Sequence, residues 1–395
     1  MNKFITPSLA GFLAVCCSIS SPAFGANTLT RAEIDDGWIL LFDGETTFGW
    51  APRGDAKWTV TDGELSTEPG SGAGMLATTT EFADLELKAD FWIDAQANSG
   101  VFLRAPTQGD ITALNAYEVN IYDAHTNWPT GSINEVGRAK GSPKSTGQWN
   151  TYHLTARGAD LVVRLNEAAV LEAKDNKHAR GVVALQQYNG QGTVKFRNIR
   201  LKPLGLKSIF NGKDLTGWRE IPDRKSVYSV TPESYLNVKN GNGDLQTETA
   251  YGDFIFQLDI ISNGQHLNSG VFFRAQPGQF WSGYESQIRN QWQDNDRTKP
   301  VDFGTGGIYN RQPARRVIST DHQWFTKTIV AHGPHMSVWI DGIQVSDFTD
   351  TRSPSNNARQ GYRAEPGVIS LQGHDPTTDL SFRNLRVTEL PAARP

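Results

Sequence analysis

Cysteine is almost absent from this sequence of 395 residues, which contains only Cys16 and Cys17 near its start. If the segment that carries both is removed, no disulfide can brace the chain and no thiol can serve in catalysis. The sequence also lacks a later run of about twenty apolar residues, so we expect no membrane span. It has no basic stripe or block of one charge, and its net charge of -4 predicts neither nucleic acid nor an anionic membrane as a partner.

The first residues have a pattern of their own. A lysine near the N-terminus precedes an apolar run, Leu9–Val15, and the segment Ser-Pro-Ala-Phe-Gly-Ala at 21–26. This pattern predicts a bacterial-type secretory signal peptide at residues 1–26, so we expect export to the periplasm or to the outside of the cell. Residues 13–16 resemble a lipoprotein signal, but Val15 stands where a small residue is usually needed, so lipidation is not expected.

Glycine and proline are abundant, with 38 and 19 residues, and long helical patterns are rare. Alternating runs of Val, Ile, Phe, Trp and Tyr, bounded by Gly, Asn, Asp and Pro, predict an all-β chain of short strands. The length suits two domains, each with about ten to twelve strands packed in two layers. Examples of expected strands are Asp84–Ile93, Ser99–Arg104, Thr151–Arg157 and Leu161–Leu165.

The second half of the sequence repeats the first almost end to end. The expected domains are residues 27–204 and 207–390, followed by a tail at 391–395. The link near Pro203 is short, so the two copies have little freedom to separate. The matched segments include Leu41-Phe-Asp-Gly44 with Ile209-Phe-Asn-Gly212, Gln148-Trp149 with Gln323-Trp324, and Phe196-Arg-Asn198 with Phe382-Arg-Asn384.

One stretch stands out because both halves place polar residues in it at strand spacing. Asn-Ser-Gly-Val-Phe-hydrophobic-Arg precedes Tyr-Glu-Val-Asn in the first half and Tyr-Glu-Ser-Gln in the second. Since strand side chains alternate between faces, Glu118 and Asn120 share one face, as do Glu285 and Gln287. We expect these positions on an inner sheet face. Burying such a pair without partners costs several kcal/mol, so a polar network or an open cleft must lie over it.

Together these motifs resemble the 3-keto-disaccharide hydrolase domain family. The resemblance covers both halves and implies two tandem concanavalin A-like jelly-roll β-sandwiches. It implies a carbohydrate partner, a glycoside already oxidised to a ketone at C3. It implies no organic cofactor, leaves room for a divalent metal ion and indicates no oligomeric state. The motifs that carry it are Phe-Asp-Gly with Gly-Trp, Asn-Ser-Gly-Val-Phe, Gly-Tyr-Glu-x-Gln-Ile, Thr-Gly-Gly-Ile-Tyr309, and Leu-Gln-x-His374 with Phe-Arg-Asn.

The implied reaction follows from the chemistry of the ketone. A carbonyl at C3 acidifies the hydrogen on C2, so a base can remove that hydrogen and the C1 substituent can leave by β-elimination. Addition of water then completes a net hydrolysis. Such an enzyme needs a base near C2, donors or a metal for the enolate oxygen, and an acid for the leaving oxygen.

The second copy matches the family pattern better, and the resemblance places the catalytic set there. Glu285 is the expected general base or metal ligand, with Gln287 beside it on the same strand face. His374 is expected as a second metal ligand or as an acid and base shuttle, since histidine ordinarily titrates near neutral pH. Arg274 is expected to polarise the ketone, and Tyr309 to donate to the leaving oxygen.

Other residues are expected to bind the sugar. An exposed indole in Gly-, Asn- and Asp-rich sequence can stack on a pyranose face. The tryptophans in such sequence are Trp128, Trp281 and Trp292. The predicted substrate-binding set also includes the polar residues of the first copy's repeated stretch, Arg104, Glu118 and Asn120.

The first copy departs from the family pattern. Asn134 stands where the second copy has Tyr309, and Tyr188 stands where it has His374. Losing a phenol and an imidazole together argues against catalysis in this copy. It is therefore either a carbohydrate-binding or scaffold domain, which we favour, or one wall of a shared cleft.

Two other readings of the same residues stay open. In a non-catalytic, lectin-like protein, Glu285 and Arg274 would form a buried ion pair and His374 would be a rim residue. A retaining glucanase is disfavoured, because such enzymes hold two carboxylates about 5 to 5.5 Å apart and Glu285 is the one acid in the second copy's segment Glu285-x-Gln287-x-x-Asn290. Residues 374–379 could bind Ca²⁺, but Asp-Pro-Thr-Thr is more often a plain turn.

Overall fold

The computed structural model of the protein describes Met1 and residues 26–141 and 143–392. The predicted signal peptide lies outside the described residues, except for its two ends. One α-helix, α1 (Arg31–Asp35), occurs in the described part of the chain, and a capping box formed by Thr30 and Glu33 begins it. No described helix is long and apolar enough to cross a membrane.

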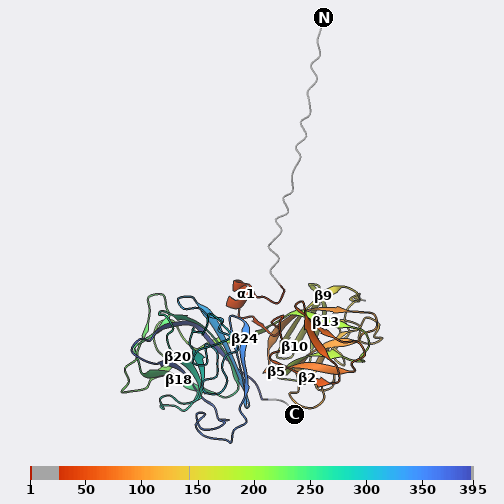
Figure 1. Ribbon diagram of the computed structural model, residues 1–395. Coiled ribbons are helices and arrows are strands. Elements are labelled where there is room, and N and C mark those ends of the chain that lie inside the picture. The colour runs from red at the N-terminus through yellow and green to blue at the C-terminus, as the bar shows by residue number, and fades with distance from the viewer. Residues whose placement is uncertain (2–25, 142, 393–395) are drawn as a thin grey trace.

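Figure 1 shows two β-sandwiches side by side. The strands of the first are β1 (Ile39–Leu40), β2 (Trp50–Gly54), β3 (Trp58–Thr61), β4 (Glu64–Thr67), β5 (Gly74–Phe82), β6 (Leu85–Ile93), β7 (Ser99–Ala105), β8 (Tyr117–Ile121), β9 (Trp149–Arg157), β10 (Asp160–Leu165), β11 (Ala168–Lys174), β12 (Gly181–Gln187) and β13 (Val194–Pro203). An eight-stranded sheet has the order β11-β10-β9-β6-β13-β4-β3, with β1 also paired to β13. A five-stranded sheet has the order β2-β5-β12-β7-β8.

The strands of the second sandwich are β14 (Lys207–Ser208), β15 (Trp218–Glu220), β16 (Val227–Val230), β17 (Leu236–Lys239), β18 (Gly243–Tyr251), β19 (Phe254–Ser262), β20 (Ser269–Ala275), β21 (Tyr284–Ile288), β22 (Phe325–His332), β23 (His335–Ile340), β24 (Ile343–Thr349), β25 (Gly367–Gly373) and β26 (Asp379–Glu389). The eight-stranded sheet runs β16-β17-β26-β19-β22-β23-β24, with β14 on β26. The five-stranded sheet runs β15-β18-β25-β20-β21.

The two sandwiches share one topology. Adding thirteen to every strand number of the first reproduces the strand order of the second in both sheets. The prediction of an all-β chain with two tandem concanavalin A-like β-sandwiches is therefore confirmed. The expected strand number was too low, because strands of two to four residues such as β1 and β15 are too short to show alternation.

Burial differs from strand to strand. Every second residue of β6 is buried against the core while its neighbours are partly exposed, as expected for a sheet with one solvated face. All residues of β20 and of β21 are buried, so both faces of these strands are covered. Val271 and Phe273 of β20 belong to the main core of the second sandwich, whereas Phe272 belongs to a separate small cluster on the opposite face.

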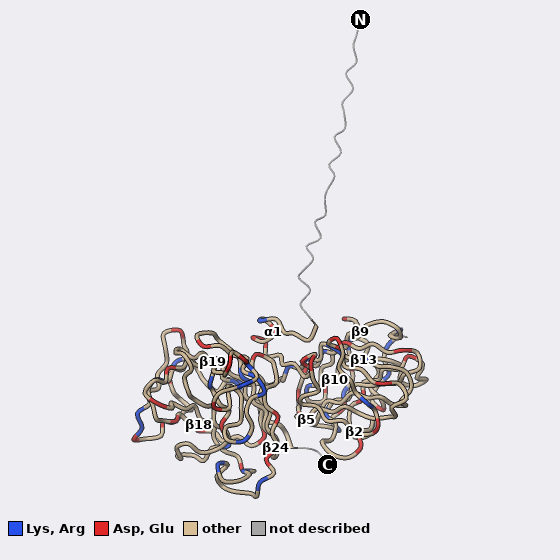
Figure 2. Tube along the Cα trace, viewed as in Figure 1, with Lys and Arg blue, Asp and Glu red and all other residues tan. Residues whose placement is uncertain are grey.

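Direct contacts join the two sandwiches. Trp339 of β23 packs beside Phe82 with ring centroids 6.4 Å apart, and its indole N–H donates to the Leu40 carbonyl. Arg180 of the first sandwich lies 2.7 Å from the Asp253 carboxylate of the second. Figure 2 shows acidic and basic residues interspersed along both sandwiches. The copies therefore pack through apolar and polar contacts in addition to the short link.

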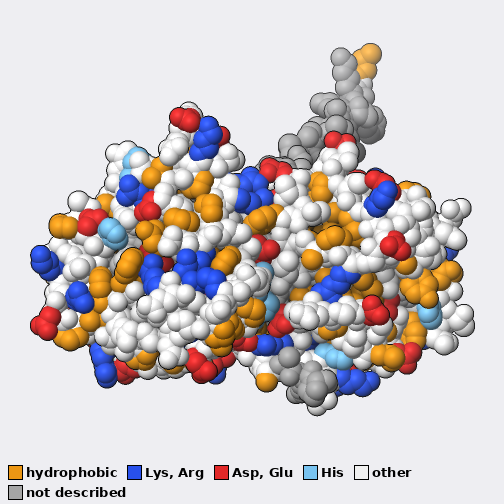
Figure 3. All heavy atoms as spheres, turned by 60° about the horizontal axis from the view of Figure 1, so that its bottom comes forward, with side chains coloured by type: hydrophobic (Ala, Val, Ile, Leu, Met, Phe, Trp, Pro, Cys, Tyr) orange, Lys and Arg blue, Asp and Glu red, His pale blue; other side chains and the backbone are white. Residues whose placement is uncertain are grey.

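A cavity of about 390 Å³ lies between the two sandwiches, where Figure 3 shows a furrow. His335 Nε2 lies 3.0 Å from Asp347 Oδ1, and Thr79 donates to the same oxygen across the boundary. His332 Nε2 accepts from the Glu81 backbone N–H at 3.2 Å, and burial lowers the pKa of His332 to about 3. Two of these hydrogen bonds join the first sandwich to the second, so the furrow is part of the interface between the sandwiches.

Candidate active site

The repeated stretch of the second sandwich forms β20 and β21, neighbours in the five-stranded sheet. Tyr284 and Ile288 of β21 belong to the core, so Glu285 and Gln287 point to the opposite side. This corrects our expectation of an inner sheet face. The pair lies on the outer face because the hydrophobic residues of β21 occupy the alternate positions.

The glycine of the Asn-Ser-Gly motif makes room for the carboxyl group. Gly270 pairs in register with Gln287, and a methyl group at Gly270 would lie 2.6 Å from Glu285 Oε1. In the first sandwich, a methyl group at Gly100 would lie 3.1 Å from Glu118 Oε1. A methyl group at Gly270 would therefore displace the Glu285 carboxyl more than one at Gly100 would displace that of Glu118.

A cavity of about 240 Å³ opens over this outer face. Five predicted site residues line it: Glu285, Gln287, Tyr309, His374 and Trp281. Four residues that sequence reasoning gave no role complete the lining: Asn242, Asn268, Phe280 and Gln372. The structure thus brings the predicted carboxyl, phenol and imidazole groups to one opening.

Arg359 is a further site residue that sequence reasoning missed. Its guanidinium donates to Glu285 Oε2 at 2.7 Å and stacks 4.0 Å from the centre of the Trp281 ring. Burial raises the pKa of Glu285 to about 7, and the positive charge of Arg359 opposes that rise. The signal that could have revealed Arg359 is the long β24–β25 connection, residues 350–366, since the equivalent connection in the first sandwich spans only residues 175–180.

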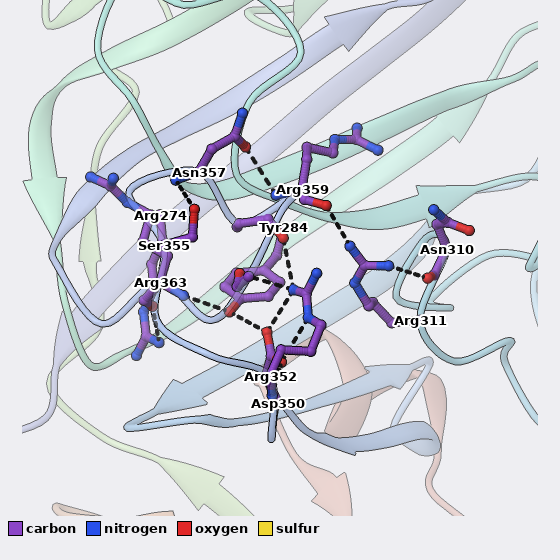
Figure 4. A network of polar contacts seen from close by, with 12 residues as sticks. Arg274, Tyr284, Asn310, Arg311, Asp350, Arg352, Ser355, Asn357, Arg359 and Arg363 are labelled. Carbon is purple, nitrogen blue, oxygen red and sulfur yellow. Dashed lines mark hydrogen bonds and ion pairs between the residues drawn. The ribbon is translucent and has the colours of Figure 1, made fainter.

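A polar network holds this connection against the sheet, as Figure 4 shows. The Tyr284 hydroxyl donates to Asp350 at 2.7 Å and accepts from the Arg363 backbone N–H at 3.0 Å. Arg311 donates to the backbone carbonyl of Arg359 at 2.8 Å. Tyr284 is the residue before Glu285 and faces the other side of the strand, so a single strand anchors the loop and carries the carboxylate.

His374 makes a polar contact through each of its ring nitrogens. Its Nδ1 lies 2.9 Å from Asp375 Oδ2, and its Nε2 lies 3.3 Å from the Asn268 side-chain amide. An ionised carboxylate only accepts and an amide nitrogen only donates, so these two contacts favour the tautomer with the proton on Nδ1 and a lone pair on Nε2. Asp375 also accepts from the Thr377 backbone N–H at 2.8 Å, so the turn at residues 374–378 holds the carboxylate that contacts the imidazole.

Two polar atoms of the lining are without protein partners. Asn268 Oδ1 and Gln372 Oε1 are buried and make no hydrogen bond to any described residue. Asp302 accepts from the side-chain amides of Asn268 and Gln287, at 3.0 and 3.1 Å, which fixes both carboxamides. Buried polar groups are nearly always bonded, so the two unpaired oxygens indicate a place for ligand hydroxyl groups or water.

Comparison with known proteins assigns the fold to a family. The model of the 3-keto-alpha-glucoside-1,2-lyase-like domain matches residues 37–202 and again residues 205–388, once for each sandwich. The chain belongs to this family. The resemblance inferred from the motifs is confirmed, and each sandwich is a lyase-like domain.

Individual relatives are distant. A curated 3-keto-disaccharide hydrolase from Bacteroides thetaiotaomicron is 26% identical over 196 residues, which cover 41% of this chain and 67% of that protein. A solved structure described as a glycosyl hydrolase from Parabacteroides distasonis is 20% identical, with a TM-score of 0.41 over 46% of this chain and 100% of its own. A carbohydrate binding module from Bacillus subtilis is 18% identical, with a TM-score of 0.32 over 39% of this chain and 95% of its own.

Arg274 does not reach the cavity of the second lyase-like domain. Its buried guanidinium donates to the Gly252 carbonyl at 3.1 Å and to the Gly333 carbonyl at 2.6 Å, and it pairs with Asp253 at 3.0 Å. The predicted role in polarising a ketone is therefore withdrawn. The alternative Glu285–Arg274 ion pair is also absent, because each residue has a different partner.

The predicted tryptophans divide between the site and other surfaces. Trp281 lines the cavity and is 48% exposed, so its ring can meet a ligand. Trp292 lies outside the cavity, with the Arg297 guanidinium 4.1 Å from its ring centre. Trp128 belongs to the first domain, where its backbone carbonyl accepts from Asn120. Of the three predicted tryptophans, Trp281 is therefore the one that lines this cavity.

The first lyase-like domain lacks most of the site. Burial raises the pKa of Glu118 to about 7, and the Asn134 side chain opposes that rise, but no described cation pairs with the carboxyl group. Tyr188 is 60% exposed at the position of His374. Arg104 is buried and donates to the Ala83 carbonyl at 3.0 Å. No residue of the first domain lines the 240 Å³ cavity, so the two domains do not form a shared cleft there.

The described residues were also tested as metal ligands. Nowhere in the described part of the chain do three or more His, Cys, Asp or Glu side chains gather closely enough to hold an ion. Among the described residues of these types, only Glu285 and His374 line the cavity, and Arg359 already bonds Glu285 Oε2 while Asp375 bonds His374 Nδ1. These residues do not fit a divalent ion in this arrangement, so no step below passes through one.

Proposed function

We propose that the second lyase-like domain cleaves glycosides that carry a ketone at C3, by removing the C2 proton and expelling the C1 substituent. The observation that carries this proposal is the shared cavity, which brings the buried carboxyl group of Glu285 and the oriented imidazole of His374 to one opening. Family membership and the distant 3-keto-disaccharide hydrolase relative support the same class of substrate.

The proposed reaction begins at Glu285. Its carboxylate takes the proton from C2, and the electron pair of that bond forms the enolate of the C3 ketone. The enolate collapses to the ketone and expels the C1 oxygen, which takes its proton from Tyr309 and leaves a C1–C2 double bond. Burial raises the pKa of Tyr309, so its phenol stays protonated until this step.

Water completes the cycle. His374 Nε2 takes a proton from water as the water oxygen bonds to C1, and the new enolate recovers a proton at C2 from Glu285. The protonated imidazole then returns a proton to the Tyr309 oxygen. Each group ends in its starting state, and the net reaction is hydrolysis of the C1–oxygen bond.

The remaining residues position these groups. Arg359 holds the Glu285 carboxylate from one side, and Asp375 keeps the His374 lone pair directed at the cavity. Trp281 offers a flat apolar surface for a pyranose ring. Cavities for drug-sized ligands begin at about 300 Å³, so a volume of about 240 Å³ suits one ring in the site, with the rest of the glycoside in solvent.

The test compares a 3-keto-glucoside with the unoxidised glucoside, each with and without a chelator. We expect release of the aglycone from the keto substrate alone, at the same rate in both conditions. Release from both substrates would indicate a conventional glycosidase. Binding of either glucoside without release would indicate a lectin-like protein, and loss of activity with the chelator would restore the metal hypothesis.

For the first lyase-like domain we propose a carbohydrate-binding or scaffold role. Glu118 and Asn120 occupy the strand face that corresponds to that of Glu285 and Gln287, but Asn134 stands in place of Tyr309 and Tyr188 in place of His374, and no described cation pairs with Glu118. Saturation-transfer NMR with the same glycosides, read on a Glu285→Gln background, tests for a second binding site.

We also propose that the protein acts after export, from the pattern of residues 1–26. Fractionation of expressing cells, with mass spectrometry of the N-terminus, tests this. A mature N-terminus at Ala26 or Asn27 in the periplasm or medium is expected, whereas an intact Met1 in the cytoplasm would contradict it.

A further inference from the structure

A lysine is buried directly behind the strand that carries Glu285. Lys327 of β22 is fully buried, and its Nζ donates to the backbone carbonyls of Ser286 and Gln287 at 3.0 and 2.9 Å. Both carbonyls belong to β21, on the core side of the sheet that bears Glu285 on its outer side. Lysine is almost never fully buried unless it is paired, so this position requires an explanation.

Glu285 is the charged group that acts on Lys327. Burial lowers the pKa of Lys327 to about 7, and the charge of Glu285 opposes that change. Asp259 of the adjacent strand β19 pairs in register with Thr326 and accepts from its hydroxyl, so it faces the other side of its sheet. The Lys327 ammonium and the Glu285 carboxylate therefore lie on opposite sides of strand β21. The protein interior has a low dielectric constant, so charges interact more strongly there than in water.

Several charged or titratable groups face Glu285 from the surrounding elements. They are Arg359 from the 350–366 connection, Asp244 from β18, Asp302 and Tyr309 from the loop after β21, and His374 at the end of β25. Arg359 favours the ionised form of Glu285, whereas Asp244 and Asp302 favour the neutral form. A cation behind the strand would offset the two carboxylates.

The first domain provides an internal comparison. Tyr152 occupies the position of Lys327, and its hydroxyl donates to the Asn120 carbonyl at 2.6 Å, the counterpart of the Gln287 carbonyl. A neutral phenol is thus sufficient to bond this strand in a domain that lacks the catalytic groups. The need for a backbone hydrogen bond does not explain why the second domain buries a lysine there.

We propose that the Lys327 ammonium is a positioning residue that holds the Glu285 carboxyl in its ionised form. The proposal rests on the proposed function for the role of Glu285 as base, but its electrostatic content is independent of turnover. By linkage, each charge favours the other by the same free energy, so removing either must shift the titration of its partner.

Carboxyl ¹³C NMR of the whole protein tests this, with the Glu285 signal assigned by its loss in Glu285→Gln. In Lys327→Met and in Lys327→Tyr, which copies Tyr152, we expect the Glu285 midpoint to rise by about one pH unit or more, a tenfold change in its ionised fraction. Lys239→Met, which removes an exposed ammonium beside Asp379, is the matched control and should leave the midpoint unchanged. An unchanged midpoint in Lys327→Met overturns the proposal.

The reciprocal measurement needs no substitution of the lysine. In Glu285→Gln, the Lys327 side-chain ¹³C signal should titrate about one unit lower than in the native protein, and an unchanged midpoint again overturns the proposal. Turnover is assayed separately on the 3-keto-glucoside. If the two titrations are coupled but the protein does not turn over the 3-keto-glucoside, the Lys327 proposal stands and the proposed function is rejected. If the protein turns over the substrate but the titrations are independent, the proposed function stands and the Lys327 proposal is rejected.

Discussion

The Arg359 guanidinium lies 2.7 Å from the Glu285 carboxylate, although 74 residues separate the two in the sequence. The contact depends on the connection at residues 350–366, for which the first domain has only the short segment 175–180. The two domains thus differ because the 350–366 connection of the second domain places the Arg359 guanidinium beside Glu285, whereas the connection in the first domain is much shorter. The predictions below use the first copy as an internal control wherever it offers an equivalent residue.

Removal of the carboxylate from each copy should have different effects. Glu285→Gln is expected to lower kcat/KM for a 3-keto-glucoside by about 10²–10⁴, since a positioned base contributes about that much. Glu118→Gln should leave most of the activity, because Glu118 lies outside the 240 Å³ cavity. Steady-state kinetics of both variants measures these effects. Equal losses of kcat/KM would show that the two copies form one shared site.

Removal of the Arg359 cation should move the pH profile. Burial raises the pKa of Glu285 to about 7 even with Arg359 opposing it, so Arg359→Met should raise that pKa further. The base acts only when ionised, above its pKa. Activity should therefore fall about tenfold at pH 7 and recover toward pH 9. The exposed Arg219→Met is the control, and parallel profiles for Arg359→Met and the native protein would contradict this account.

A methyl group at Gly270 should impair the site without unfolding it. It would lie 2.6 Å from Glu285 Oε1, so the carboxyl must move away from Arg359, whereas the backbone of Gly270 is ordinary for a strand. We expect Gly270→Ala to lower kcat/KM by about ten- to a hundredfold, the size of effect that displacement of a catalytic group by about 1 Å produces.

Gly100→Ala is the equivalent change in the first domain, where the contact would be 3.1 Å. It should leave kcat/KM near the native value. Thermal melting of both variants checks that each remains folded, and an inactive Gly100→Ala would reject the separation of the two copies.

Acid should destabilise the fold through His332. Burial lowers its folded-state pKa to about 3, below the ordinary value of 6.5, so the unfolded chain binds a proton first as the pH falls. The stabilising contribution is complete above about pH 6.5 and is lost toward pH 3, at no more than about 1.4 kcal/mol per pH unit.

Urea unfolding at several pH values between 7.5 and 4 measures this contribution. His332→Gln should show a shallower dependence of the unfolding free energy on pH than the native protein. The exposed His322→Gln should match the native slope. Identical slopes for His332→Gln and the native protein would show that His332 does not carry the effect.

Sequence reasoning succeeded where the pattern is local or repeated. Alternation placed Glu285 and Gln287 on one face, and the duplication was visible in matched motifs such as Phe-Arg-Asn. It failed at Arg274 because a β-bulge follows Phe272, and Arg274 has a φ of 48°. This backbone turn redirects the guanidinium from the cavity to the Asp253 carboxylate, and an extended strand pattern does not reveal it.

The sequence by itself determined that the chain is a duplicated all-β protein, and it pointed to Glu285 and His374 of the second half as candidate site residues. Only the tertiary structure decided that the carboxylate faces outward, that Arg359 covers it and that Lys327 lies behind it. The physical reason is that alternation and repeats are properties of neighbouring residues. Contacts between distant segments depend on the path of each loop and on which hydrophobic side chains pack in the core.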